Sequence, residues 1–315
     1  MITAVELGLL YAVMALGVYL TFRILEFADL TVDGSFTTGA AVAATGIVAG
    51  LPPILTTVMA FAAGLLAGVI TGILHTKGNV DGLLAGILTQ IGLYSINLRI
   101  MGTSNLGLLR EDTLVTPFKD AGLVGSGNWA GPAILLVVPA VILALIIWFL
   151  HTDTGLAMRA TGDNPEMIRS LGVSTDFQKI LGLSLSNGLV ALSGALIAQY
   201  QGFADISMGI GMIVAGLASV IIGQAVFGRL TIFRAASAVL LGAVLYRVVI
   251  QLALMAGANP NDMKLISAVL VVLALILPQW KGFAAFKRKL PHKRLTPEER
   301  TRRKLTAENA ALEED

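Results

Sequence analysis

The sequence predicts an all-α polytopic membrane protein, and three observations support this fold class. Hydrophobic residues make up 56% of the 315 residues and charged residues only 13%, whereas soluble domains are about 25% charged. The apolar residues gather into helix-length segments. Two similar pentapeptides, Phe27-Ala28-Asp29-Leu30-Thr31 and Phe203-Ala204-Asp205-Ile206-Ser207, also lie at matching breaks in the apolar pattern.

About nine helical segments follow from the apolar runs. The first has the length of a membrane span and lacks a small-residue cleavage site, so we expect a retained helix and not a signal peptide. The second and ninth are shorter than the roughly 20 residues of a perpendicular crossing, which predicts helices that are broken, re-entrant or extended by flanking polar residues. The segments are 4–25, 34–50, 54–74, 82–101, 132–150, 178–201, 209–227, 234–255 and 263–278.

The C-terminal residues set the expected topology. Residues 279–315 hold ten of the 22 Lys and Arg residues, which predicts a basic cytoplasmic tail beside anionic headgroups and not a nucleic-acid-binding segment. The loop 151–177 is then cytoplasmic and the N-terminus extracytoplasmic. This arrangement leaves only Arg99, Arg110, Lys119 and Lys264 outside, and it puts Arg23, Lys77, Arg159, Arg169, Lys179, Arg229, Arg234 and the tail inside.

The two pentapeptides predict an internal repeat. An odd number of segments separates them, so the repeats should have inverted topology, with one at roughly 4–101 and the other at 178–278. Segment 132–150 would be the crossing helix between them. We therefore expect a transmembrane domain at 1–278. The outer connection 102–131 is either a solvated linker or a contact for a soluble partner.

A short helix is predicted in the cytoplasmic loop. Asn164 or Asp163 can cap it, Pro165 suits its first turn, Glu166 favours its positive end, and Gly172 can stop it after about two turns.

An apolar stripe should lie on this helix. Met167, Ile168 and Leu171 would form it, flanked by Arg159 and Arg169. Such a stripe either enters a groove on a partner protein or packs back onto the membrane domain.

The same loop resembles that of ABC importer permeases of the branched-chain amino acid and ribose type. Their pattern, G-x-x-x-R-A-x-G-x-N-P-x-x-x-R-x-x-G, is matched from Gly155 to Gly172. The stretch 29–35 resembles the family's D-L-S-V-G-S segment with an extra Asp33, and 209–223 resembles a glycine-rich segment in which Gln224 replaces the last glycine. The run 160–228 is similar to the subgroup that works with tryptophan- or tyrosine-type solute-binding proteins.

The resemblance implies an ATP-driven importer of an amino acid or related small solute in the bacterial inner membrane. The chain would be a homodimeric, multi-pass transport subunit and not an enzyme. Two separate ABC ATPase subunits would hold ATP and Mg, and an extracytoplasmic solute-binding protein would deliver the solute. The residues expected at the ATPase contact are Arg159, Gly162, Asp163, Asn164, Pro165, Glu166, Met167, Ile168, Arg169 and Leu171.

Polar residues at the broken segments are candidates for the translocation path. Carboxylates are costly in hydrocarbon and usually face a bundle interior or a water-filled path. The alternative is helix capping, by Asp29 or Asp33 for segment 34–50 and by Asp205 for segment 209–227. Arg247 lies inside a segment and should pair with a carboxylate or snorkel. The path candidates are Asp29, Thr31, Asp33, Ser35, Gln199, Asp205, Ser207 and Gln224.

Other chemistries have little support in the sequence. There are no cysteines, and the three histidines lie far apart, so we expect no metal site and no cofactor on this chain. No G-x-x-x-x-G-K-[ST], G-x-S-x-G or H-E-x-x-H motif occurs. The alternative function is an ion-coupled secondary transporter or channel with inverted repeats, which would use Asp29, Asp33 or Asp205 as proton or sodium sites.

Overall fold

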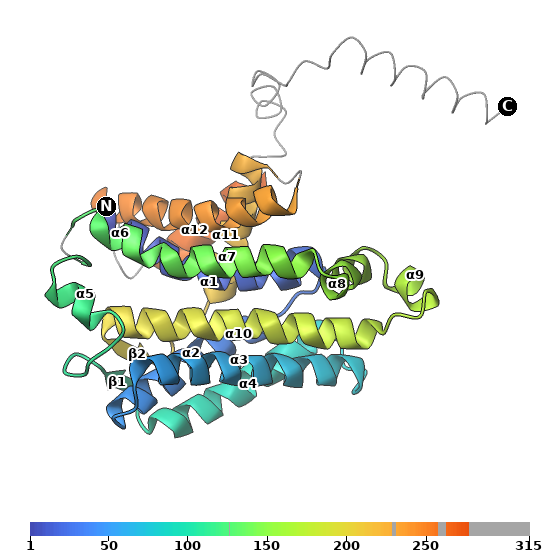
Figure 1. Ribbon diagram of the computed structural model, residues 1–315, viewed down its shortest axis with the longest axis horizontal. Coiled ribbons are helices and arrows are strands. Elements are labelled where there is room, and N and C mark those ends of the chain that lie inside the picture. Colours follow the sequence, from blue (N-terminus) through green and yellow to red (C-terminus); the bar gives the residue numbers. More distant parts are fainter. Residues whose placement is uncertain (126, 229–230, 258–262, 277–315) are drawn as a thin grey trace, which may run out of the picture. The chain divides into compact units, whose positions relative to one another are not determined.

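The computed structural model describes residues 1–125, 127–228, 231–257 and 263–276, and most of them lie in helices (Figure 1). Residues 1–274 form one compact unit. The predicted tail 279–315 and the predicted position of Arg229 lie outside the described residues.

The long helices follow the apolar segments of the sequence. Helix α1 continues into a π-helical turn, η1 (Leu20–Ile24), and α6 leads directly into α7. The helices are α1 (Ile2–Tyr19), α2 (Thr31–Val48), α3 (Pro53–Thr76), α4 (Gly82–Met101), α6 (Ala130–Leu135), α7 (Val137–Leu150), α10 (Thr175–Gln201), α11 (Met212–Phe227), α12 (Ile232–Met255) and α13 (Met263–Ile276).

Shorter elements lie at the two ends of this bundle. One end holds α5 (Thr116–Asp120), β1 (Asn105–Gly107) and β2 (Phe203–Asp205), and the two strands pair antiparallel with Asn105 opposite Asp205. The chain begins at this end (Figure 1). The opposite end holds α8 (Asp153–Asp163) and α9 (Pro165–Ser170).

Six helical stretches in the described part are long and apolar enough to span a membrane: 2–24, 53–76, 82–101, 130–150, 175–201 and 232–255. The remaining three predicted segments coincide with α2, α11 and α13. Helix α2 is too rich in Thr, Ser and Gly to meet the same hydropathy, and α11 and α13 have only 16 and 14 residues. The helical, polytopic fold is thus confirmed, while nine crossings and inverted repeats remain predictions.

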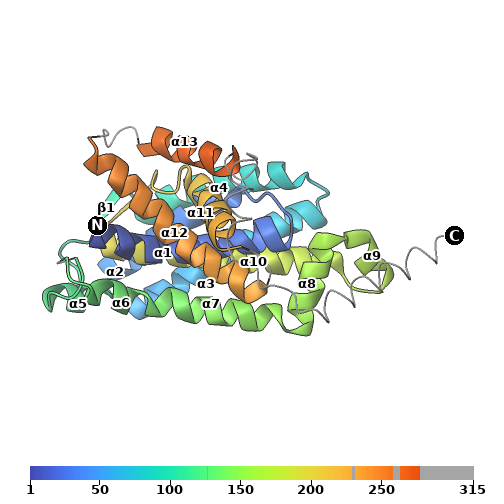
Figure 2. The ribbon, with the colours of Figure 1, turned by 90° about the horizontal axis from the view of Figure 1, so that it is seen from above.

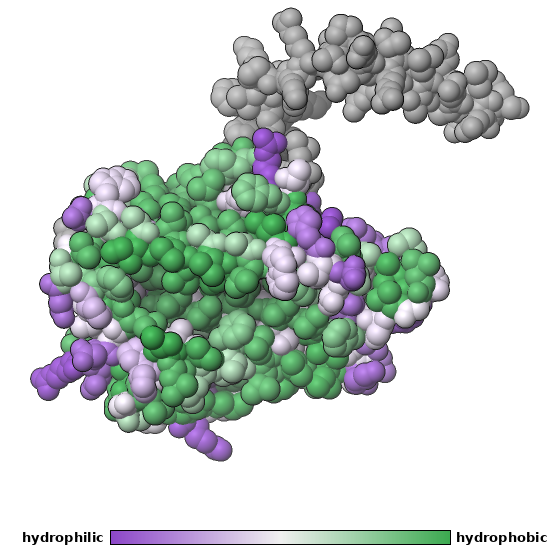
Figure 3. Space-filling model, viewed as in Figure 1, coloured by the Kyte–Doolittle hydropathy of each residue, from purple (hydrophilic) through white to green (hydrophobic). Residues whose placement is uncertain are grey.

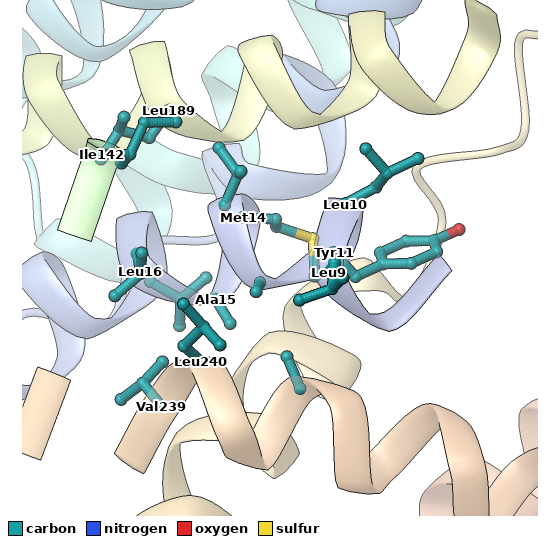
Figure 4. Close-up of a cluster of buried hydrophobic side chains, with 14 of the residues drawn as sticks. Leu9, Leu10, Tyr11, Met14, Ala15, Leu16, Ile142, Leu189, Val239 and Leu240 are labelled. Atoms are coloured by element: carbon teal, nitrogen blue, oxygen red, sulfur yellow. The ribbon is translucent and has the colours of Figure 1, made fainter. Parts of the chain in front are cut away.

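Helices α1 and α10 form the centre of the bundle. From top to bottom in Figure 1, the stack runs from α11 and α12 through α1 and α10 to the pair α2 and α3, and then to α4. Figure 2 shows the same bundle from above. The span of α1 is 83% buried and that of α10 72%, against 28–39% for the other four. A helix that is apolar on all sides is expected at such a buried position. Figure 4 shows the side chains of α1 between those of α7, α10 and α12.

These central helices run antiparallel. Tyr200 at the end of α10 donates to Glu6 at the start of α1, and Ser186 donates to the carbonyl of Gly17 farther along. Apolar side chains cover much of the outer surface between the two polar ends (Figure 3). A surface of this kind is suited to hydrocarbon contact.

Small residues allow α2 to approach α10 closely. A Cβ atom on Gly39 would overlap the backbone of Ala191, and one on Gly194 would overlap the backbone of Phe36. Helix contacts in membranes commonly depend on such small residues because lipid supplies no hydrophobic drive for association.

Replacing Gly39 with Ala should therefore destabilise the α2–α10 contact. The added methyl group meets backbone atoms that cannot move independently, and such overpacking costs about 1–3 kcal/mol. Gly92 on α4 is the matched control, because a Cβ there has open space. Thermal unfolding of the two variants in detergent should show a loss for Gly39→Ala and none for Gly92→Ala. Equal melting temperatures would contradict the close approach.

Candidate functional site

Helix α2 begins inside the bundle. After η1, residues 25–30 return into the protein, and Asp29 and Thr31 are buried. Asp29 Oδ2 accepts a hydrogen bond of 2.6 Å from Asn187 Nδ2, near the middle of α10. The start of α2 therefore lies at the level of the centre of α10.

A buried polar network surrounds this start. The backbone N–H of Thr31 donates to Asp29 Oδ1 at 2.9 Å, so Asp29, which precedes the N-cap residue Leu30, satisfies one donor at the start of α2. Ser35 Oγ donates to Asn187 Oδ1 at 2.7 Å, and the hydroxyls of Thr31 and Thr71 are 2.8 Å apart. The network thus satisfies backbone and side-chain groups that have no access to water.

Helix α11 also begins inside the bundle. The chain leaves β2, and residues 206–211 lead inward to Met212. The backbone N–H groups of Gly211 and Ile213 donate to the two carboxylate oxygens of Asp33, each at 2.8 Å. Asp33 belongs to the first turn of α2, so the N-termini of α2 and α11 meet at this residue. Asp33, a predicted cap for its own helix, instead accepts from the first N–H groups of α11.

Carboxyl groups lie at the starts of both helices of this junction. Each helix N-terminus has a partial positive charge equivalent to about half an elementary charge. Asp29 and Asp33 place carboxylates at these ends, where they also satisfy N–H groups. Two broken helices can therefore begin within an apolar protein without unpaired backbone donors at these positions.

A cleft of about 320 Å³ lies beside the junction. It is formed by α2, α4 and the segment 206–211. Asn97 donates to the carbonyl of Gly34 at 3.4 Å, while its buried Oδ1 has no hydrogen-bond partner in the described part of the chain. The lining residues are Asp33, Gly34, Thr37, Gln90, Ile91, Tyr94, Ser95, Asn97, Ile206 and Ile210.

The other predicted path residues lie elsewhere. Gln199 is buried, donates to Thr57 and accepts from the N–H of Leu114, so it joins α10 to α3 and the outer connection. Gln224 lies toward the α8 end of the bundle, beside Arg159. Of the eight residues, only Asp29, Thr31, Asp33 and Ser35 are brought together.

Asp205, the last residue of β2, and Ser207 lie at the end of the bundle opposite α8. Asp205 accepts hydrogen bonds from the backbone and hydroxyl of Ser207 and from Asn105. Partial burial raises the pKa of Asp205, but these hydrogen bonds outweigh that effect and leave the pKa below its usual value. The two pentapeptides therefore hold their carboxylates in different environments, one buried at a helix start and the other near the surface.

A second buried carboxylate ties the outer connection to the bundle. Glu6 is fully buried, accepts from the Tyr200 hydroxyl at 2.6 Å and accepts from the N–H of Gly125 at 3.3 Å. Lys119 donates to the carbonyl of Tyr200 at 2.6 Å. Burial lowers the pKa of Lys119, and the charge of Glu6 opposes that shift. The connection is thus attached to α1 and α10 and is more than a solvated linker.

Two interior polar residues were not predicted as functional, and a third has a different partner from the expected one. Asn187 and Glu6 lie within predicted apolar segments, where a lone polar residue is the available signal. Arg247 lies over the ring of Tyr11, 3.6 Å from its centroid, and pairs with no carboxylate in the described residues. A cation–π contact takes the place of the expected ion pair.

The short helix at the other end is α9. Asn164 Oδ1 accepts the N–H of Met167 at 3.0 Å, and Gly172 has φ +84° at the following turn. The helix has six residues and is thus shorter than two turns. A further helix, α8, precedes it and includes Arg159, Gly162 and Asp163, where only one short helix was predicted.

The predicted apolar stripe does not lie on one exposed face. Ile168 is buried, while Met167 and Leu171 are 48% and 70% exposed. Phe177, near the start of α10, is also exposed, and Figure 3 shows apolar surface at the tip where α9 lies. Arg169 is 3.6 Å from Asp176 and donates to Thr175, which joins α9 to the start of α10. Ile168 therefore anchors the helix, and its neighbours remain available for contact.

Residues 1–276 match the family model described as "Branched-chain amino acid transport system / permease component". A tyrosine transport system permease protein of Clostridioides difficile (strain R20291) is 41% identical over 274 residues, covering 87% of this chain and 90% of that protein. An autoinducer 2 import system permease protein of Salmonella typhimurium is 36% identical over 84 residues, covering 26% of this chain and 24% of that protein.

Two solved structures have a similar fold. PsaBC from Streptococcus pneumoniae in complex with Fab has a TM-score of 0.51 and 16% identity, covering 86% of this chain and 89% of that chain. An inward-facing metal-chelate type ABC transporter has a TM-score of 0.50 and 16% identity, covering 89% of this chain and 84% of that chain.

Replacing Asp33 with Ala should destabilise the start of α11. The N–H groups of Gly211 and Ile213 lose their charged acceptor, and a hydrogen bond of this kind contributes about 1.5–3 kcal/mol. Asp81→Ala is the matched control, because Asp81 caps α4 from an exposed position and its loss should cost about 1 kcal/mol. Hydrogen exchange should increase at residues 211–214 in Asp33→Ala only. Unchanged exchange there would show that Asp33 does not hold the junction.

Proposed function

The chain belongs to the permease family of the branched-chain amino acid transport systems, and on this premise we propose that it forms the membrane path of an ABC importer for an amino acid such as tyrosine. The observation that supports this substrate class best is the 41% identity to a tyrosine permease along nearly the whole chain. The chain supplies geometry for transport, while ATP is hydrolysed by separate subunits.

We assign the ATPase contact to α9 and the adjoining tip. Met167 and Leu171 are apolar, exposed and held on a helix that is capped by Asn164 and anchored by Ile168. Asp163, Pro165 and Glu166 are exposed beside them. A capped helix with an exposed apolar end is suited to insertion in a groove on a partner. Movement of the two ATPase subunits would then be transmitted through α8 and α9 to the ends of α7 and α10.

The distribution of charge supports a cytoplasmic position for this tip. Arg23 and Arg159 line one pocket at this end, and Arg169 and Lys179 line another together with His75. Lys77 pairs with Asp176 nearby. Positive residues concentrate on the cytoplasmic side of membrane proteins, so the β1–β2 end and the N-terminus would face outward. The solute-binding protein would dock on that outer end.

The cleft beside Asp33 is the proposed substrate site. It lies where two helices begin inside the bundle, an arrangement that transporters use near the membrane centre. Asp33 places a carboxylate on the wall of the cleft, and its charge is opposite to that of a substrate ammonium group. The unpaired Oδ1 of Asn97 is a further acceptor.

A second copy of the chain would close this cleft. Tyr94 and Ile91 line the cleft and are 51% and 63% exposed, and the α4 span is only 28% buried. Lipid tails cannot satisfy the polar group of Gln90, whereas a facing protomer can. This supports the proposed homodimer, in which each chain contacts one ATPase subunit.

Uptake into proteoliposomes tests the function. Vesicles with this chain, its ATPase and a binding protein should accumulate labelled tyrosine only when ATP is inside with the ATPase. Collapsing the proton and sodium gradients should leave that uptake unchanged. Gradient-driven accumulation without an ATPase would instead establish an ion-coupled transporter.

The tip can be tested separately. Leu171→Asp should reduce retention of the ATPase, because it places a charge at a desolvated contact. Leu109→Asp is the matched control, since Leu109 is 89% exposed at the opposite end. The affinity for the ATPase, measured by co-purification, should fall at least about tenfold, or about 1.4 kcal/mol, for Leu171→Asp alone. Equal retention of the ATPase by both variants would remove α9 from the interface.

A further inference from the structure

A second polar cavity of about 450 Å³ lies at the α8 end of the bundle. It is lined by residues of α1, η1, α8, α11 and the start of α12, and by His151 after α7. None of its side chains belongs to the cleft beside Asp33. Its lining includes two guanidinium groups, from Arg23 and Arg159, and the hydroxyl-bearing residues Tyr19 and Thr231.

The hydrogen-bond donors in this cavity have few partners. In the described part of the chain, neither Arg23 nor Arg159 forms an ion pair or a side-chain hydrogen bond. The amide nitrogen of Gln224 is buried and also without a hydrogen-bond partner among those residues. A buried donor of this kind normally has a partner, because leaving it unpaired costs free energy.

The remaining charges favour an anion. Asp163 is the one carboxylate among the lining residues, and it forms no ion pair with either arginine in the described part. Helix α12 begins at the cavity after its N-cap Thr231, so its positive end adds to the two guanidinium charges. His151 donates through Nδ1 to the carbonyl of Ile147 at 2.6 Å, which leaves Nε2 for another partner.

We propose that this cavity binds a phosphate group. Arginine is suited to phosphate oxygens because its planar guanidinium donates two parallel hydrogen bonds. The group can come from an anionic phospholipid or from soluble phosphate. The surroundings fit the lipid: Phe22 and Phe233, next to lining residues in sequence, are 38% and 64% exposed, and the cavity lies at the end of the α1 span. This inference is independent of the substrate proposed for the cleft.

The test compares wild type with Arg23→Gln in nanodiscs of phosphatidylcholine containing a minor fraction of phosphatidylglycerol. The full-length protein is used in the complex in which it purifies, and retained lipid is counted by native mass spectrometry. Wild type should enrich phosphatidylglycerol, and Arg23→Gln should lose about tenfold in affinity. Arg99→Gln is the control, because Arg99 lines a different pocket. Arg23→Lys should restore part of the binding if the fold is intact.

A second arm titrates inorganic phosphate against the same variants and follows the melting temperature. Stabilisation by phosphate that requires Arg23, without lipid enrichment, would support the cavity with soluble phosphate as the source. If neither ligand depends on Arg23, or if Arg99→Gln has the same effect, the cavity is not a phosphate site.

Discussion

The need to satisfy backbone donors where α2 and α11 begin inside the bundle governs the rest of the structure. A helix N-terminus leaves N–H groups without intrahelical partners, and hydrocarbon supplies none. Asp29 accepts a hydrogen bond from the first N–H group of α2. Asp33, itself in the first turn of α2, accepts hydrogen bonds from two N–H groups at the start of α11. One carboxylate therefore holds together two elements that are 178 residues apart in sequence. The cleft beside Asp33 lies where these two helix starts meet.

Close packing around α1 and α10 supports this junction. Asn187 on α10 binds Asp29 and Ser35, so α10 positions the start of α2. Gly39 lets the two backbones approach closely enough for these short contacts. At the outer end, Glu6 and Tyr200 fix the same pair of helices, and at the other end Arg169 fixes α9 to α10. The central helix α10 thus contacts the start of α2, the outer connection and the tip for which an ATPase contact is proposed.

Local sequence features predict the elements well and their long-range partners poorly. Apolar runs indicate the long helices, and Asn164, Pro165 and Gly172 indicate α9, because each effect acts within a few residues. The contact between Asp33 and Gly211 has no local signal, since it joins positions that are distant in the chain. The similarity of the two pentapeptides is also an incomplete guide. Asp29 and Asp205 share neighbours in sequence, but one lies at a buried helix start and the other beside a surface strand pair.

The most direct test of the junction uses the absence of native cysteines. Thr37→Cys on α2 and Ile210→Cys before α11 line the same cleft and can be joined by a short bifunctional thiol reagent. In membranes, the pair should cross-link within one chain at high yield, and ATP-driven uptake should stop if the cleft beside Asp33 is the path. A Thr37→Cys and Leu171→Cys pair is the negative control and should not cross-link. If the Thr37→Cys and Ile210→Cys pair gives no more intramolecular cross-link than this control, the two helix starts do not meet.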